Sequence, residues 1–159
     1  MNDTDLYYFE DVAIGDKRSY DVPYEVTERE IVEMGERFDP QPFHIDPVAA
    51  KASVFGGLVA SSVHVFAIWV AVGTKSKQPR SAALSALGFD KLRLRAAIRA
   101  GDSLRTRAVV KEKRLSNSRP HCGIVTMENE MYNQHDTVVF TLEHSFLIKC
   151  RAYDDAQQT

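Results

Sequence analysis

The sequence predicts an α+β fold in which a curved antiparallel sheet wraps around one apolar helix. Residues Leu58–Val72 carry apolar side chains at 12 of 15 positions, so a helix over this stretch is apolar on nearly every side and must be covered. The chain after it alternates apolar and polar residues over several long stretches, which indicates strands with one buried face. A sheet that curves around the helix would bury both elements at once.

The elements around this helix follow from caps, turns and periodicity. Thr27 and Glu30 form a capping box, which predicts that a helix begins there. Asp46 before Pro47 has the pattern of an N-cap with proline at the first helical position. The predicted order is a strand at Arg18–Val26, helices at Thr27–Phe38, Val48–Ser53 and Leu58–Val72, and strands at Leu84–Ile98, Leu104–Lys111, Gly123–Tyr132 and Val138–Cys150.

Composition limits the classes of protein that the chain can belong to. With 159 residues, 44% of them hydrophobic, it fits one globular domain over residues 1–159. Two cysteines, Cys122 and Cys150, are too few for a disulfide framework, and no signal peptide is visible, so a cytoplasmic location is expected. The apolar stretch is too short to cross a bilayer. Residues 91–119 hold 10 of the 20 basic residues but no aromatic residue to stack on bases, which argues against a nucleic-acid partner.

The segment from Asp39 to His44 is the first candidate for chemistry. Pro40 and Pro42 stiffen it and push the residues before them out of the helical region. Because Asp39 and His44 are five positions apart in the chain, the carboxylate and the imidazole meet only if the segment curls. On spacing alone, the simpler interpretation is that Asp39 opens a turn before proline and that His44 is a half-buried loop residue.

A wider pattern changes this interpretation. The run Asp39-Pro40-Gln41-Pro42-Phe43-His44 is followed by Phe55-Gly56-Gly57-Leu58-Val59-Ala60-Ser61, and later by Arg99-Ala100-Gly101-Asp102-Ser103-Leu104. In this order the motifs resemble the MaoC-like dehydratase family, whose members are relatives of the (R)-specific enoyl-CoA hydratases. The resemblance covers residues 9–150, nearly the whole chain.

The resemblance implies a hot-dog fold, in which a sheet wraps a central helix, and a homodimer or a dimer of dimers. It also implies a CoA or acyl-carrier thioester as substrate, with no metal or redox cofactor and no membrane. By the same resemblance, Asp39 and His44 are the catalytic pair, and the backbone N–H of Ser62 donates to the enolate oxygen. Gly57 and Arg119 are expected to bind the substrate, and Arg119 is the best candidate for contact with a CoA phosphate.

The expected reaction is the reversible hydration of a 2-enoyl thioester to a 3-hydroxyacyl thioester. It needs a base, an acid and a donor to the developing enolate oxygen. An Asp–His pair supplies the first two, and the N-terminal end of a helix supplies the third. Ser62 departs from the family, which usually has glycine there, so a hydroxymethyl group stands near the thioester. Two alternatives stay open: a thioesterase on the same scaffold and a non-catalytic module that binds acyl thioesters.

Other reactive side chains have simpler interpretations. Ser61, Ser62 and His64 lack the G-x-S-x-G pattern of a nucleophile elbow and are expected to be small polar residues of a packed helix. No C-x-x-C or H-E-x-x-H pattern is present, so no metal site is expected. His144 lies among the apolar residues of the last strand and is expected to be a core histidine with satisfied hydrogen bonds.

Overall fold

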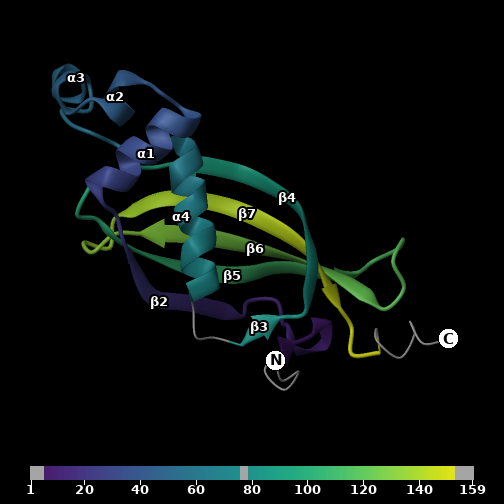
Figure 1. The fold of residues 1–159 in the computed structure, drawn as a ribbon. Helices are drawn as coiled ribbons and strands as arrows, with labels where there is room; N and C mark the ends of the chain where they lie inside the picture. Colours follow the sequence, from purple (N-terminus) through teal and green to yellow (C-terminus); the bar gives the residue numbers. More distant parts are fainter. Residues whose placement is uncertain (1–5, 76–78, 153–159) are drawn as a thin grey trace.

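A five-stranded antiparallel sheet in the order β2-β5-β6-β7-β4 forms the body of the protein (Figure 1). The structure is a computed structural model and describes residues 6–75 and 79–152. The strands of this sheet are β2 (Lys17–Glu25), β4 (Ala83–Leu94), β5 (Ser103–Leu115), β6 (Cys122–Tyr132) and β7 (Val138–Lys149). A small parallel sheet pairs β1 (Leu6–Tyr7) with β3 (Arg80–Ser81).

Helix α4 (Ser62–Lys75) lies across one face of the large sheet, and the sheet curves around it (Figure 1). Three shorter helices gather at the end of α4 where that helix begins: α1 (Glu28–Phe38), α2 (Pro42–Ile45) and α3 (Pro47–Ala52). A single 3-10 turn, η2 (Phe9–Asp11), follows β1. This arrangement is the hot-dog fold, and the fold class expected from the sequence is confirmed.

Two apolar clusters fill the space over the concave face of the sheet. The first lies under α4 and includes Val65, Ile68, Val72, Leu104, Met131, Phe140 and Leu142. The second lies under the N-terminal segment and includes Phe9, Val12, Ala108, Val110, Val125, Met127, Phe146 and Ile148. The two clusters are therefore offset along the strands, each covered by a different element.

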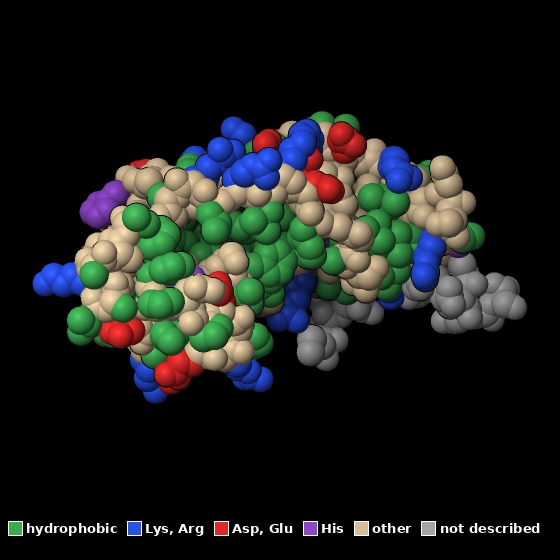
Figure 2. Space-filling view, turned by 90° about the horizontal axis from the view of Figure 1, so that it is seen from above, with side chains coloured by type: hydrophobic (Ala, Val, Ile, Leu, Met, Phe, Trp, Pro, Cys, Tyr) green, Lys and Arg blue, Asp and Glu red, His purple; other side chains and the backbone are tan. Residues whose placement is uncertain are grey.

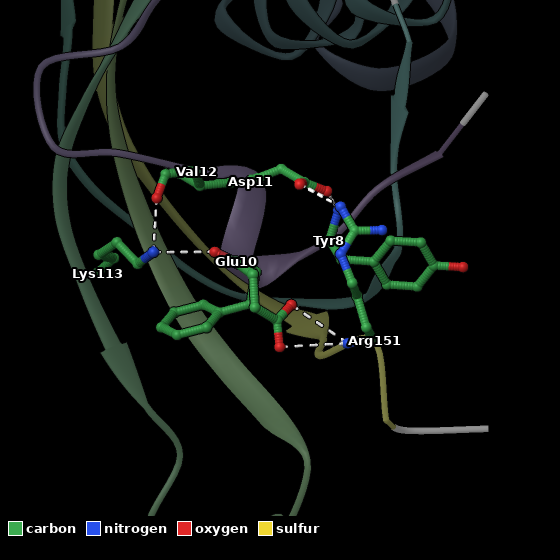
Figure 3. A network of polar contacts seen from close by, with 7 residues as sticks. Tyr8, Glu10, Asp11, Val12, Lys113 and Arg151 are labelled. Atoms are coloured by element: carbon green, nitrogen blue, oxygen red, sulfur yellow. Dashed lines mark hydrogen bonds and ion pairs between the residues drawn. The ribbon is translucent and has the colours of Figure 1, made fainter. Parts of the chain in front are cut away.

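A set of polar contacts holds the N-terminal segment over the second cluster (Figure 3). The Lys113 ammonium donates to the carbonyl oxygens of Phe9 and Val12. Between these two residues, the Glu10 carboxylate accepts from the Arg151 backbone N–H at 3.2 Å. These contacts join the N-terminal segment to β5 and to Arg151, and they keep the Phe9 ring on the sheet.

The central helix begins four residues later than predicted, at Ser62 instead of Leu58. The N–H of Val59 donates to the carbonyl of Phe43 at 3.2 Å, and the carbonyl of Val59, which would accept from the next turn of a helix begun at Leu58, is contacted by His44 Nδ1 at 2.6 Å. The helix then continues to Lys75, beyond the predicted end. Apolar composition alone could not reveal this long-range hydrogen bond.

Helix α4 is also less fully covered than predicted. Its buried residues are His64, Val65, Ile68 and Val72. By contrast, Val63 is 46% exposed and Val70 is 44% exposed, so one side of this apolar helix faces outward in the single chain. Within the described part of the chain, no helix is long and apolar enough to cross a membrane.

Local capping predictions are confirmed. The Thr27 Oγ1 accepts from the Glu30 N–H at 3.2 Å, and the Glu30 carboxylate accepts from the Thr27 N–H at 3.3 Å. Asp46 caps α3 by accepting two N–H groups of its first turn. In contrast, α2 was not predicted, and the strand expected over Leu84–Ile98 ends at Leu94.

Candidate active site

A cavity of about 430 Å³ lies at the N-terminal end of α4. Asp39, His44 and Ser62 all line it, although they come from three different elements. The opposite wall is formed by the chain that follows β4, including Arg95 and Ile98. The structure therefore brings together the three residues predicted to act on the thioester.

The short helix α2 places His44. Pro42 is its first residue, and the N–H of His44 donates to the carbonyl of Gln41 at 2.8 Å, so the proline-rich segment curls into one turn. The His44 side chain is 8% exposed, and its Nδ1 lies 2.6 Å from the carbonyl oxygen of Val59. Because a carbonyl only accepts, Nδ1 carries the proton in this contact. The contact leaves Nε2 for chemistry.

Asp39 faces the free nitrogen of that imidazole. It ends α1 as its C-cap, and its N–H donates to the carbonyl of Gly35 at 2.9 Å. Its Oδ2 lies 3.5 Å from His44 Nε2, and the carboxylate is 32% exposed. Since a direct N–H···O hydrogen bond is about 2.7–3.2 Å long, this gap suits two groups that act on the same water molecule or substrate oxygen. Spacing alone favoured Asp39 as a simple turn residue, and that interpretation does not account for the proximity of its carboxylate to His44.

Gly35 permits the close approach of α1 and α2, and it was not among the residues predicted to form the site. A Cβ added there would lie 2.9 Å from the Cβ of His44 and 2.9 Å from the Cγ2 of Ile45. Glycine inside a helix costs roughly 0.5–1 kcal/mol relative to alanine, so its use in the middle of α1 is the signal that could have indicated close packing.

Ser62 stands at the start of α4, where backbone N–H groups have no partner within the helix. Ser61 acts as the cap: its Oγ accepts from the N–H of His64 at 3.3 Å, and its carbonyl accepts from the N–H of Val65 at 2.9 Å. None of the hydrogen bonds among the described residues uses the Ser62 N–H. This group is therefore available to an oxygen atom in the cavity, with the helix dipole behind it.

Gly57 lies outside the cavity lining and faces a different partner. A Cβ on Gly57 would lie 3.3 Å from Nη1 of Arg99. The Arg99 guanidinium in turn donates to the carbonyl oxygens of Phe55 and Leu58. In this chain Gly57 thus gives Arg99 room to tie down the loop that leads to α4, and its predicted role in substrate binding stays a prediction.

Arg119 is not brought to the cavity within one chain. Arg119 lies in the loop after the end of β5. The start of β5 follows Ile98 closely in the chain, and Ile98 lines the cavity. The 13 residues of β5 span about 40 Å, so Arg119 lies at the far end of the sheet. Arg95, from the same basic segment, is the positively charged residue that lines the cavity. The predicted contact of Arg119 with phosphate stays a prediction.

Two further histidines differ in their surroundings. His64 is buried in α4 with Nδ1 unpartnered, and burial lowers its pKa while the nearby Glu30 carboxylate opposes that effect. His144 is only partly buried, and its described contacts are with the rings of Trp69, Phe89 and Phe146. His144 was expected to be a core histidine with satisfied hydrogen bonds, and its partial burial among aromatic rings does not fit that prediction.

These observations define a class of protein: hot-dog folds that carry an Asp–His pair beside the start of the central helix. A family model described as "MaoC like domain" matches residues 10–133. The chain belongs to this MaoC-like family, as its motifs had indicated.

The proteins that this chain resembles include a MaoC-like dehydratase. The uncharacterized protein YdeM of Bacillus subtilis (strain 168) is 28% identical over 128 residues, which cover 78% of this chain and 86% of YdeM. The crystal structure of the MaoC-like dehydratase from Rhodospirillum rubrum has a TM-score of 0.84 and 33% identity, covering 91% of this chain and 98% of that one. The unliganded R-hydratase PhaJ1 from Pseudomonas aeruginosa has a TM-score of 0.72 and 22% identity, covering 91% and 86%, and this likeness shows the fold.

Proposed function

We propose that this protein catalyses the reversible hydration of a 2-enoyl thioester to a 3-hydroxyacyl thioester, with CoA or an acyl-carrier arm as the thiol. The observation that carries the proposal is the pair of Asp39 and His44, 3.5 Å apart in one cavity with the start of α4. Membership of the MaoC-like family and the likeness to a dehydratase of that family support it.

In the proposed hydration, a water molecule lies between the Asp39 carboxylate and Nε2 of His44. The pair accepts one proton of this water while its oxygen bonds to the β-carbon of the enoyl group. Negative charge moves to the thioester oxygen, where the N–H of Ser62 and the dipole of α4 stabilise it. The pair then delivers the proton to the α-carbon, and the double bond is lost. Dehydration follows the same steps in reverse.

The free edge of β4 supports a homodimer. Among the residues that the structure describes, β4 pairs only with β7, and apolar side chains are exposed along it, with Leu87 51% and Leu94 50% exposed. Figure 2 looks onto this edge and shows hydrophobic side chains in a band across the middle, with charged side chains along one border. A long apolar edge strand invites pairing with another strand.

Pairing of two β4 strands about a two-fold axis would be antiparallel. The start of one β4 then lies beside the end of the other, because a two-fold axis relates the same surface on both copies. Such a dimer brings the far end of the second copy's sheet, which carries Arg119, toward the cavity of the first. The proposed role of Arg119 at a CoA phosphate therefore depends on the dimer.

The test is a panel of 2-enoyl-CoA substrates, followed both by loss of the conjugated double bond and by release of free thiol. We expect the double bond to disappear without thiol release. Asp39→Asn and His44→Ala should each lower turnover by about 10² or more while the fold stays intact. The matched controls Asp21→Asn and His135→Ala change exposed residues outside the cavity and should keep full activity.

Other outcomes would contradict the proposal in distinct ways. Release of thiol with the double bond retained would replace it with a thioesterase. Binding of the thioester without any turnover would replace it with a binding module. Near-normal turnover in either active-site variant would remove that residue from the mechanism.

A further inference from the structure

A second groove of about 600 Å³ lies on the concave face of the sheet, at the C-terminal half of α4. Its walls are Trp69 and Val70 of α4, Ala86 and Phe89 of β4, and Phe146 of β7. The groove is distinct from the cavity that holds Asp39 and His44, and it opens along the same strand, β4.

Three polar residues cross the floor of this groove, and we call them the polar belt: Thr106 of β5, Asn129 of β6 and His144 of β7. Asn129 pairs with Ala108, the next residue after Thr106 on the same face of β5. His144 pairs with Met127, the next such residue of β6. The belt therefore runs diagonally over three neighbouring strands, and it separates the two apolar clusters of the core.

The polar side chains of the belt make few hydrogen bonds to other described residues. Thr106 is 2% exposed, and its Oγ1 has no hydrogen-bond partner among the described residues. The amide nitrogen of Asn129 donates to the carbonyl of Met127 in its own strand at 3.0 Å, and its Oδ1 can accept a further bond. His144 is stacked on the Phe89 ring, with centroids 5.0 Å apart. Since buried polar groups are normally paired, a belt of this kind indicates a partner from outside the chain.

The charge of the groove limits the chemical class of ligand that can bind in it. The described residues that line it include no Lys, Arg, Asp or Glu. A carboxylate or phosphate in the groove would be desolvated without a counter-charge, which is strongly unfavourable. Burial also lowers the pKa of His144, which favours its neutral form. The groove therefore suits a ligand that is mostly apolar and carries a neutral polar group.

We propose that this groove holds the acyl chain of the thioester substrate, and that Thr106, Asn129 and His144 select chains that carry a neutral oxygen group such as a hydroxyl or a ketone. This inference rests on the proposed hydratase function, and it names the class of its substrate. In the two-fold pairing proposed above, the groove of one copy lies beside the cavity of the other, because the groove is at the start of β4 and the cavity is at its end. One thioester can then occupy both.

The test compares 2-enoyl-CoA substrates of equal length, one unsubstituted and the others with a single hydroxyl or ketone beyond C4. We expect a higher kcat/KM for at least one oxygenated substrate in the wild-type protein. Thr106→Val keeps the shape but removes the hydroxyl, so it should lower the ratio of kcat/KM for that substrate to kcat/KM for the plain substrate by roughly two- to tenfold, as for one hydrogen bond. His144→Phe, which fits the aromatic stack, should act in the same direction.

A stability measurement separates this role from a structural one. Because the Thr106 hydroxyl is unpaired in the free protein, Thr106→Val should leave thermal stability unchanged or raise it. The control Thr126→Val makes the same change on the other face of β6, where the hydroxyl bonds to Ser145, and should not alter the ratio of the two substrates.

The outcomes distinguish the two proposals. Equal kcat/KM for plain and oxygenated substrates, or equal loss of both in Thr106→Val, overturns the polar belt as a selector and leaves the hydratase intact. Absence of turnover of every enoyl thioester by the wild-type protein overturns the hydratase, and the belt inference with it.

Discussion

Replacement of Gly35 by alanine tests whether the site depends on the close approach of α1 and α2. The added Cβ would lie 2.9 Å from His44 Cβ and from Ile45 Cγ2, and 3.1 Å from the carbonyl oxygen of His44. Carbon atoms normally approach to about 3.5–4.0 Å, so α2 must move by about 0.6 Å or more. That movement would carry the imidazole away from Asp39 and from the Val59 carbonyl.

The expected magnitude follows from the displacement. A misplacement of about 1 Å in a catalytic group can cost about 10² in rate, so we expect kcat to fall by roughly ten- to a hundredfold. The effect on stability should be smaller. Overpacking costs about 1–3 kcal/mol, but alanine in a helix is favoured over glycine by about 1 kcal/mol.

The assay combines enoyl-CoA hydration, measured by loss of the conjugated double bond, with thermal unfolding. Glu36→Ala is the matched control, because it adds an alanine at the neighbouring, exposed position of α1. It should keep full activity. Unchanged kcat and KM in Gly35→Ala, with the fold intact, would refute the argument that glycine is needed to hold His44 in place.

Three further predictions concern single side chains. Ser62→Gly should be nearly neutral for all substrates, because the Ser62 N–H stays available; a large gain in turnover with unchanged stability would instead show that the hydroxymethyl group blocks the pocket. Arg119→Ala should raise KM by roughly ten- to a hundredfold for CoA substrates, the equivalent of about 1.5–3 kcal/mol, and hardly affect substrates with a short pantetheine arm; equal effects on both would make Arg119 structural. His144→Phe should flatten the pH dependence of stability: burial lowers the pKa of His144 in the folded state, so its contribution is present above the unfolded pKa of about 6.5 and is lost as the pH falls through the folded pKa. Chemical denaturation at about pH 7.5 and about pH 5.5 measures this, and an unchanged slope in the variant would contradict it.

Local rules allowed much of this fold to be predicted from the sequence. The capping box at Thr27, the cap at Asp46 and the alternation in the C-terminal strands act over two to four residues, so they can be recognised without the fold. The apolar stretch Leu58–Val72 indicated the central helix, but it placed the helix start four residues too early and predicted more complete coverage than the single chain has. The motif from Asp39 to His44 named the candidate site through its resemblance to a family, because spacing alone left its geometry open.

Tertiary structure alone decided how that site is built. The carbonyl of Val59 orients His44 across 15 residues of chain, and the packing of α2 against Gly35 brings its imidazole to Asp39. Strand register decided the diagonal belt that includes Thr106, which in the sequence is only a polar residue at one inward position. These features depend on hydrogen bonds and packing between elements that are far apart in the chain. Such contacts contribute to stability only after the sheet and the helices have packed together.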